Sequence, residues 1–326
     1  MANILITQHI GGAGVQMLRE ARHHVTYRDK TEPMGQAELQ TAVRHAEGLV
    51  CLLTDRVDTA VFDAAPQLKM IANVAVGYDN IDVRAATARG ILVSNTPDVL
   101  TEATADHAFA LLLALARRLP EADAYMRAGK YEKFEMFPPL LGLDVYGKTL
   151  GIVGMGRIGA AVARRGALGF GMKVLYTANS VKTAVEQELG AQKVTFPQLL
   201  HQSDFVSINV PLTPETYHLF TLDTFRQMKP TACLINTARG PIIKEDDLLV
   251  ALRQGTIWGA ALDVFEAEPE MTPGLADYHD RLLLAPHLGS ATGETRRKMV
   301  ETAVSNLLAG LAGQTPPNAL NAEQLV

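Results

Sequence analysis

Short hydrophobic runs alternate with longer amphipathic stretches along the first hundred residues. Compact apolar runs are typical of buried strands, and apolar residues repeated every three or four positions are typical of helices. The predicted helices are Val15–Ala21 and Gly35–Ala46, and the predicted strands are Asn3–Thr7, Val25–Tyr27, Leu49–Leu53, Met70–Val74 and Ile91–Val93. Strands that alternate with helices in this way predict a parallel sheet with helices on both faces.

The same alternation returns in the second half of the chain. The predicted strands there are Thr149–Val153, Lys173–Tyr176, Phe205–Val210, Ala232–Asn236, Gly259–Val264 and Leu282–Ala285. Thr101–Arg118 predicts a long helix with Thr101 as its N-cap, and Glu294–Gly310 predicts another. Because 326 residues exceed the size at which a single core usually stops growing, we expect two domains. The predicted fold class is α/β, with two doubly wound parallel-sheet domains.

Three glycines directly follow the predicted strand that ends at Val153. Gly154, Gly156 and Gly159 have the spacing G-x-G-x-x-G between a strand and an Ala-rich helix, which is typical of a dinucleotide-binding turn. Gly154 would allow the tight turn, Gly156 would let a pyrophosphate approach the backbone, and Gly159 would let the helix pack closely on the strand. This stretch therefore predicts a nucleotide site.

A second glycine cluster, Gly11–Gly14, also follows a predicted strand. Its third glycine would have to fall at position 17, which is Met17, so the phosphate-binding spacing fails. We predict a flexible turn into a helix at this cluster rather than a nucleotide site.

Composition and charge indicate a globular protein and argue against several other classes. Hydrophobic residues make up 48% of the chain and charged residues 20%, which is typical of a globular enzyme. The formal net charge of −5 argues against a nucleic-acid partner. The start of the chain has no basic and apolar segments of the signal-peptide kind, and no apolar run reaches the roughly 18 residues of a membrane helix, so we expect a cytoplasmic protein without membrane contact.

The cysteines and histidines do not predict a metal site. Cys51 and Cys233 both lie in apolar strand-like runs, which predicts buried thiols rather than a disulfide or a metal ligand. The nine histidines are scattered, with no His-x-x-x-His pair on a helix and no Cys/His cluster. We therefore expect no bound metal.

Three consecutive strands of the second half are followed by polar residues of complementary kinds. Arg239 follows the strand ending at Asn236, Glu266 and Glu268 follow the next strand, and His287 follows the last. The carboxyl ends of neighbouring parallel strands meet at one edge, so these side chains are expected to lie close together. Arg239 can bind a carboxylate through two hydrogen bonds, and a histidine can give or take a proton near neutral pH.

A carboxylate beside that histidine would fix the tautomer of its ring and favour its protonated form. The spacing does not choose between Glu266 and Glu268 for this role. Hydride transfer from a nicotinamide to a 2-keto acid needs such a set, which supplies a proton donor and a carboxylate clamp. Each of these residues alone is more often a surface or structural residue, so the set remains a hypothesis on topology alone.

The motifs together resemble the D-isomer-specific 2-hydroxyacid dehydrogenase family over essentially the whole chain. They are Gly154–Gly159, Asn236–Gly240, Asp263–Pro269 and Pro286–Ala291, in the family's order and at its intervals. Within the family the chain is most similar to the glyoxylate/hydroxypyruvate and 2-ketogluconate reductases, notably in Val76–Asn80 and Gly151–Gly156. The resemblance implies reduction of a small 2-keto acid to the D-2-hydroxy acid.

The resemblance also assigns roles to residues. It implies that Arg239 binds the substrate, that His287 is the acid/base and that Glu268 is its partner, and that the amides at Val76 and Gly77 hold the substrate carboxylate. From spacing alone, the turn at Gly77 could equally be an ordinary turn. The expected cofactor-binding residues are Thr104, Gly154, Gly156, Arg157, Ile158, Gly159, Asn179, Ser180, Lys182, Val210, Pro211, Thr216, Thr237, Ala238, Arg239, Asp263, His287 and Gly289.

The family fold is discontinuous. The resemblance implies a flavodoxin-like substrate domain formed by residues 1–99 and 288–326, with a Rossmann cofactor domain, residues 100–287, inserted into it. It also implies a homodimer joined through the cofactor domains, with the helix that begins at Thr101 and the aromatic-rich loop after it near the interface.

The turn after the second strand of the cofactor domain bears on the choice between NAD and NADP. An NAD enzyme usually has an Asp or Glu there, which accepts a hydrogen bond from the ribose 2′-hydroxyl. This chain has Asn179, Ser180 and Lys182 and no acid, and these side chains can bind a 2′-phosphate. We predict NADP as the cofactor, with NADPH preferred; because the turn has no arginine, use of NAD remains open.

Other functions on the same fold remain as alternatives. A formate-dehydrogenase-like activity is disfavoured, because that branch is expected to pair its His with Gln, and this chain has Glu268. A phosphite dehydrogenase is harder to exclude. A dinucleotide-sensing corepressor that binds other proteins is disfavoured, because the chain has no long appended tail.

Overall fold

A computed structural model describes residues 1–325 of the chain. The chain divides into two compact units. Unit 1 consists of Met1–Leu100 and the chain from Thr292 onward, and unit 2 is Thr101–Ala291. The sequence analysis placed the corresponding boundaries after residues 99 and 287.

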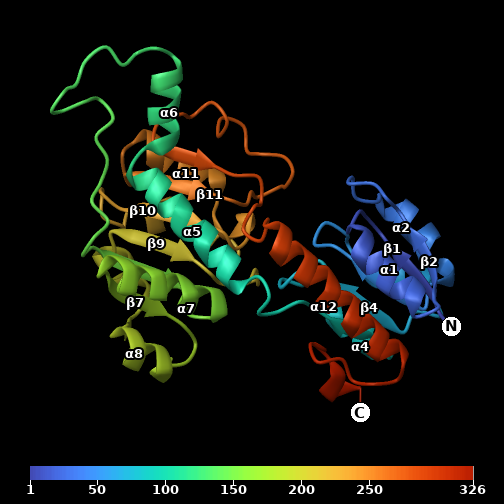
Figure 1. Cartoon of the computed structure of the whole chain (residues 1–326). Helices are drawn as coiled ribbons and strands as arrows, with labels where there is room; N and C mark the ends of the chain where they lie inside the picture. The colour runs from blue at the N-terminus through green and yellow to red at the C-terminus, as the bar shows by residue number, and fades with distance from the viewer. Residues whose placement is uncertain (326) are drawn as a thin grey trace. The chain divides into compact units, whose positions relative to one another are not determined.

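Unit 1 contains a parallel sheet of five strands in the order β2-β1-β3-β4-β5 (Figure 1). The strands are β1 (Asn3–Ile6), β2 (His24–Tyr27), β3 (Gly48–Cys51), β4 (Met70–Asn73) and β5 (Leu92–Ser94). The helices are α1 (Gly12–Glu20), α2 (Gln36–Ala42), α3 (Thr59–Ala64), α4 (Val83–Ala88) and α12 (Gly293–Leu311), with short 3₁₀ turns at Val43–His45 and Ala322–Gln324.

Helices cover both faces of this sheet, as the strongly apolar strands require. α2, α3 and α4 cover one face through a core that includes Leu39, Phe62 and Ile71. α1 and α12 cover the other face and pack on each other. The predicted flexible turn at Gly11–Gly14 is wrong in part, because α1 already begins at Gly12. A Cβ on Gly14 would lie 2.4 Å from the side chain of Val300 in α12, so this glycine permits close helix packing.

Unit 2 contains a parallel sheet of seven strands in the order β12-β11-β10-β9-β6-β7-β8. The strands are β6 (Thr149–Val153), β7 (Lys173–Thr177), β8 (Gln192–Lys193), β9 (Phe205–Ile208), β10 (Cys233–Asn236), β11 (Gly259–Leu262) and β12 (Leu282–Leu284). The helices are α5 (Thr101–Ala116), α6 (Leu119–Arg127), α7 (Arg157–Arg164), α8 (Thr183–Leu189), α9 (Phe196–Gln202), α10 (Leu222–Phe225) and α11 (Glu245–Arg253), with a π turn at Arg165–Gly169 and a 3₁₀ turn at Gly240–Ile242. The predicted fold class, two doubly wound parallel sheets, is confirmed.

Two separate cores lie on the faces of the unit 2 sheet. α5 and α7 cover one face, with Phe109, Leu112 and Leu150 in the core. α9, α10 and α11 cover the other face, where Leu199 and Leu248 are buried. The helices fix the sheet on both sides, so the loops at its carboxyl edge extend from a rigid base.

The single long helix predicted for Thr101–Arg118 is wrong at its end. α5 stops at Ala116, and Arg118 has φ 51°, which is a left-handed conformation that ends a helix. A second helix, α6, begins at Leu119, with Pro120 in its first turn, where a missing N–H costs nothing. The segment from 130 to 148 that follows contains no helix or strand (Figure 1).

The strands of unit 2 end in register at one edge of the sheet. The paired terminal residues are Val153 with Thr177 and Ile208, Asn236 with Ile208 and Leu262, and Leu262 with Leu284. The loops after β6, β7, β9, β10, β11 and β12 therefore all begin at this carboxyl edge, where ligands of open α/β sheets bind.

Candidate active site

The glycine-rich turn after β6 has the geometry that a dinucleotide requires. Gly154 has φ 96°, and a Cβ there would lie 2.7 Å from the carbonyl oxygen of Asn209. A Cβ on Gly159 would lie 2.1 Å from the carbonyl oxygen of Gly154, so α7 can approach the turn only with glycine at this position. At Gly156, in contrast, a Cβ would have no atom within 4 Å. The turn is closed toward the protein and open at Gly156, where a pyrophosphate would approach.

A cavity of about 460 Å³ opens beside this turn. Seven of the residues expected to bind the cofactor line it, and so do residues that the sequence analysis did not identify. The expected ones are Gly154, Gly156, Asn179, Ser180, Lys182, Val210 and Pro211; the others are Val153, Met155, Thr177, Ala178, Phe196, Asn209 and Leu219. Mostly apolar side chains with a few polar groups are typical of a pocket for a small molecule or cofactor.

A buried tyrosine, Tyr176, supports the turn after β7 through hydrogen bonds. The Tyr176 side chain is fully buried, and its hydroxyl accepts a hydrogen bond from Lys182 N at 2.8 Å and donates one to Glu186 Oε1 at 2.9 Å. Burial raises the pKa of this hydroxyl, the Lys182 N–H lowers it and the bond to Glu186 raises it, with a net increase that keeps the hydroxyl protonated. Asn179 and Ser180 are exposed in the turn.

The remaining expected cofactor residues do not line this cavity. Thr216 lies on the same loop as Pro211 and donates a hydrogen bond to its carbonyl oxygen at 2.7 Å. A Cβ on Gly289 would lie 3.4 Å from the methyl group of Thr104, so these two residues are neighbours. Arg157, Ile158 and Gly159 form the first turn of α7, and Thr237, Ala238, Arg239, Asp263, His287 and Gly289 lie on the loops after β10, β11 and β12.

Two buried polar atoms at this edge have no hydrogen-bond partner. They are Asn209 Oδ1 and Thr237 Oγ1, two of four such side-chain atoms in residues 1–325; the others are Thr96 Oγ1 and Ser203 Oγ. Buried polar atoms are nearly always hydrogen-bonded, so unsatisfied ones at the carboxyl edge fit a ligand with polar groups. The residues of this edge therefore fit a nicotinamide dinucleotide in their chemistry.

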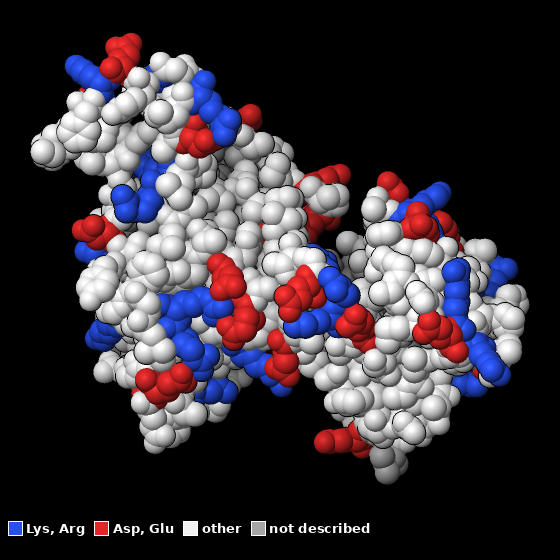
Figure 2. Space-filling view, in the orientation of Figure 1, with Lys and Arg blue, Asp and Glu red and all other residues white. Residues whose placement is uncertain are grey.

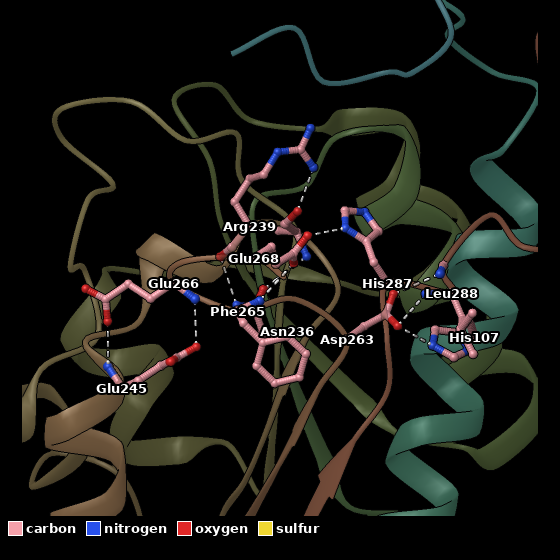
Figure 3. A network of polar contacts seen from close by, with 12 residues as sticks. His107, Asn236, Arg239, Glu245, Asp263, Phe265, Glu266, Glu268, His287 and Leu288 are labelled. Atoms are coloured by element: carbon pink, nitrogen blue, oxygen red, sulfur yellow. Dashed lines mark hydrogen bonds and ion pairs between the residues drawn. The ribbon is translucent and has the colours of Figure 1, made fainter. Parts of the chain in front are cut away.

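The loops after β11 and β12 bring a carboxylate and an imidazole together. His287 Nδ1 lies 2.8 Å from Glu268 Oε2, and both side chains are about 70% buried, at 27% and 29% exposure (Figure 3). Glu268 Oε1 accepts a hydrogen bond from Phe265 N at 2.9 Å, which fixes the carboxylate. Because Nδ1 is engaged by Glu268, Nε2 is the ring nitrogen left for proton exchange with a ligand.

Geometry separates the two glutamates that the spacing left open. Glu266 Oε1 lies 2.7 Å from His218 Nε2, and Glu268 lies against His287. The loop after β11 thus directs successive carboxylates, two positions apart, to different histidines.

His287 has an unusual backbone conformation that the preceding strand end supports. Its φ is 54°, in the left-handed region, and its N–H donates to the Asp263 carbonyl oxygen at 2.8 Å. The fully buried Asp263 carboxylate accepts hydrogen bonds from Leu288 N at 2.7 Å and Gly289 N at 2.8 Å, and it lies 3.0 Å from His107 Nε2 of α5. Hydrogen bonds to Asp263 therefore fix the backbone at His287 and at the two residues that follow it (Figure 3).

Arg239 lies on the loop after β10, beside the loop that carries Glu268. Asn236 Nδ2 donates to the Arg239 carbonyl oxygen at 2.9 Å, and Arg239 Nη1 donates to the Ala238 carbonyl oxygen at 2.8 Å. A Cβ on Gly240 would lie 1.9 Å from the backbone of Phe265, so the two loops are packed backbone to backbone. Figure 3 shows the guanidinium of Arg239 on the same side of this network as the imidazole of His287.

In unit 1, hydrogen bonds orient the carbonyl groups of the segment after β4. The Ala75 carbonyl accepts from Thr96 N at 2.9 Å, the Val76 carbonyl from Asn95 Nδ2 at 2.8 Å, and the Gly77 carbonyl from Asn73 Nδ2 at 2.9 Å. Three consecutive carbonyl groups are thus hydrogen-bonded inside the unit, which holds the backbone at Val76 and Gly77 in a fixed conformation.

Three further observations concern metal sites, membrane-spanning helices and surface charge. Among residues 1–325, no group of three or more His, Cys, Asp or Glu side chains is arranged to hold a metal ion, and no helix is long and apolar enough to cross a membrane. Acidic and basic side chains are interspersed over the face of the molecule in Figure 2.

Residues 109–289 match the family model described as D-isomer specific 2-hydroxyacid dehydrogenase, NAD binding domain. A glyoxylate reductase from Thermococcus onnurineus (strain NA1) is 50% identical over 325 residues, which cover 99% of this chain and 96% of that protein. The chain belongs to the D-isomer-specific 2-hydroxyacid dehydrogenase family. It is therefore an oxidoreductase with a nicotinamide-dinucleotide-binding domain of the Rossmann type.

Solved structures of similar proteins have the same fold. A protein from Thermus thermophilus is 44% identical and matches with a TM-score of 0.90, covering 98% of this chain and 99% of that one. An NADPH-dependent glyoxylate/hydroxypyruvate reductase from Sinorhizobium meliloti, solved with NADP and malonate, is 34% identical with a TM-score of 0.86 and covers 99% and 97% of the two chains.

Several residues that form the site of this dehydrogenase belong to no recognisable sequence motif. Phe196 and Leu219 line the cavity from α9 and from the loop before α10, and no spacing relates them to the glycine turn. Asn209 falls inside the strand predicted over Phe205–Val210, whereas β9 ends at Ile208, so Asn209 lies at the edge where ligands bind. His218 gives no local signal, since its contact with Glu266 depends on the tertiary fold.

Proposed function

We propose that the protein is an NADPH-dependent reductase of small 2-keto acids, with glyoxylate and hydroxypyruvate as leading substrates and 2-ketogluconate as a third. The observation that carries the proposal is the contact of 2.8 Å between His287 Nδ1 and Glu268 Oε2 at the carboxyl edge of a dinucleotide-binding sheet. A carboxylate–imidazole pair is the acid/base that reduction of a carbonyl to an alcohol requires.

In this proposal His287 donates a proton from Nε2 to the carbonyl oxygen of the substrate. When bound, the nicotinamide supplies the hydride that the carbonyl carbon receives. Glu268 orients the imidazole through its contact with Nδ1. In the opposite direction, the same nitrogen accepts the proton of the hydroxy acid.

Arg239 and the amides of Val76 and Gly77 are proposed to bind the substrate. A guanidinium stays charged at all relevant pH values and can donate two parallel hydrogen bonds to a carboxylate or bind a carbonyl oxygen. The proposed role of Val76 and Gly77 is that their backbone N–H groups bind the substrate carboxylate, since successive N–H groups at a turn can hold an anion. A small 2-keto acid offers both kinds of acceptor.

The preference for NADPH rests on the turn after β7. Asn179, Ser180 and Lys182 line the cavity there, and none of them carries a negative charge that would repel a 2′-phosphate. The S. meliloti reductase, named as NADPH-dependent, gives independent support from within the family. NADH remains a second, weaker cofactor in this proposal, because the turn has no arginine.

We also propose a homodimer formed through unit 2. Large apolar side chains are exposed on α6 and the segment after it: Leu119, Met126, Tyr131, Phe134, Met136, Phe137, Leu141 and Tyr146. An exposed apolar surface of this extent is typical of a protein–protein interface, and the occupant proposed here is a second copy of the chain.

The experiment that tests the function is a panel of acceptors. Oxidation of NADPH is followed by its absorbance with glyoxylate, hydroxypyruvate, 2-ketogluconate and pyruvate, and NAD⁺ reduction is followed with phosphite and formate. Turnover of glyoxylate or hydroxypyruvate is expected to exceed all others. Turnover of phosphite without turnover of any 2-keto acid would replace this proposal by the alternative on the same fold.

A further inference from the structure

We propose that Glu245 is a positioning residue for the Glu268–His287 pair. Its carboxylate binds the backbone of the loop that carries Glu268, and by this means it holds Glu268 in place behind the imidazole. The inference rests on the proposed function in one respect, since it takes His287 as the acid/base.

Glu245 is the first residue of α11 and is almost fully buried, with 1% of its surface exposed. A carboxylate in such a place must have hydrogen-bond donors, because burying an isolated charge is very unfavourable. Glu245 Oε1 accepts from Glu266 N at 2.8 Å, and Oε2 accepts from Thr272 N at 3.4 Å. Both donors are backbone groups of the loop after β11.

These two donors lie on either side of Glu268 in the sequence. Glu266 precedes it by two residues and Thr272 follows it by four. One buried carboxylate therefore anchors both arms of the short loop from which Glu268 extends to His287. Neither donor belongs to a helix or strand, so the Glu245 carboxylate replaces the backbone partners that regular structure would supply.

A second glutamate completes the arrangement from the opposite side. Glu266 Oε2 accepts from Glu245 N at 3.1 Å, so each glutamate side chain binds the backbone N–H of the other (Figure 3). The other oxygen of Glu266 lies 2.7 Å from His218 Nε2, and the His218 ring stacks on Tyr217 at a centroid distance of 4.0 Å. The Glu266 carboxylate is therefore held by an imidazole on one oxygen and by the Glu245 N–H on the other.

Packing against the loop that carries Arg239 also restricts the loop after β11. Gly240 packs against the backbone of Phe265 with no space for a Cβ, and Phe265 N donates to Glu268 Oε1. The position of Glu268 is thus set by the two hydrogen bonds to the Glu245 carboxylate and by packing against the loop that carries Arg239. Removing one anchor is expected to displace the carboxylate by a fraction of an ångström or more, a scale on which acid–base catalysis is sensitive.

Glu245→Gln tests the proposal with the smallest change of shape. The amide keeps one acceptor oxygen, but its NH₂ group is then directed at a backbone N–H, so one of the two anchors is lost. We expect kcat for glyoxylate reduction to fall by roughly tenfold to a hundredfold. The matched control is Asp247→Asn in the same first turn of α11, where the carboxylate binds Leu222 N at 3.0 Å and not the catalytic loop. The control is expected to retain kcat within about twofold.

A double-mutant cycle separates positioning from general destabilisation. If Glu245 acts through Glu268, then Glu245→Gln costs less than about twofold when introduced into Glu268→Gln. The solvent deuterium isotope effect on kcat should also increase in Glu245→Gln, because proton transfer becomes slower. A ratio of this kind does not depend on the fraction of folded enzyme.

An equal loss of kcat in both backgrounds, with an unchanged isotope effect, would overturn the inference and assign Glu245 a structural role only. If Glu245→Gln does not fold, Glu266→Gln is measured in the same cycle with the same expected pattern, since it loosens the other side of the crossed pair. Absence of any 2-keto acid reduction by the wild-type protein would instead be a failure of the proposed function.

Discussion

Glu268 Oε2 and His287 Nδ1 are separated by 2.8 Å, although their positions in the chain are 19 residues apart. The contact forms because the loops after two adjacent parallel strands, β11 and β12, begin at the same edge. Nδ1 is engaged by the carboxylate, and in the proposed reaction Nε2 is the ring nitrogen that exchanges a proton with the substrate.

Replacing His287 by Gln is expected to lower kcat for glyoxylate by roughly 10² to 10⁴-fold, the usual contribution of general acid–base catalysis. The dissociation constant of NADPH, measured by fluorescence titration, should change much less than kcat, because the cavity beside the glycine turn is untouched. Turnover close to that of the wild type would remove His287 from its proposed role.

Asn179→Asp is expected to shift the ratio of kcat/KM with NADPH to that with NADH by about tenfold or more toward NADH. The new carboxylate would repel a 2′-phosphate and could accept a hydrogen bond from a 2′-hydroxyl. Steady-state kinetics with both cofactors provide the measurement. A wild-type preference for NADH, or an unchanged ratio in the variant, would show that this turn does not select NADPH.

Two glycines of the same turn should respond differently to alanine. Gly159→Ala brings a methyl group against the Gly154 carbonyl oxygen, which should destabilise the protein by about 1–3 kcal/mol. Gly156→Ala adds a methyl group where no atom lies within 4 Å, so its Tm should match the wild type while NADPH affinity falls. Thermal unfolding and cofactor titration of both variants test this, and equal Tm values would contradict it.

Neither cysteine should react with a thiol reagent in the native protein. Burial raises the pKa of the Cys51 and Cys233 thiols, and the nearby Asp55 and Asp204 carboxylates raise it further. A raised pKa reduces the thiolate fraction at mildly alkaline pH, and the thiolate is the reactive form. Titration with a chromogenic disulfide should detect no thiols in buffer and both after unfolding in urea. Rapid modification of either thiol with loss of activity would be incompatible with this.

The proposed homodimer predicts a particle mass in solution of twice the 35.2 kDa chain mass. Phe134 and Phe137 are 79% and 80% exposed, so a Phe134→Ser, Phe137→Ser double variant should elute as a monomer without loss of fold. Light scattering coupled to size-exclusion chromatography measures both. A monomeric wild-type protein would refute the proposed use of this surface.

The sequence predicts the sheets well because the strands of both units are short apolar runs, such as Thr149–Val153, with distinct ends. It also predicts which loops share an edge, since this follows from parallel strands alone. The ends of helices are harder to predict from the sequence. α5 ends before Arg118 because this residue adopts a left-handed conformation, and no local pattern predicts that α6 follows.

The polar network behind the site could not be predicted from spacing. Glu266 and Glu268 are chemically equivalent along the chain, and the choice between them depends on His218, which a separate segment brings close. Glu245 is an ordinary acidic residue in the first turn of a helix by sequence. Its contacts with Glu266 and Thr272 appear only when the loop after β11 folds back over α11.

The reaction itself is tested by the product that the wild-type protein forms from glyoxylate and NADPH. We expect one glycolate for each NADPH oxidised, quantified by chromatography against the loss of NADPH absorbance. NADPH that stays unoxidised in the presence of glyoxylate and of hydroxypyruvate would contradict it.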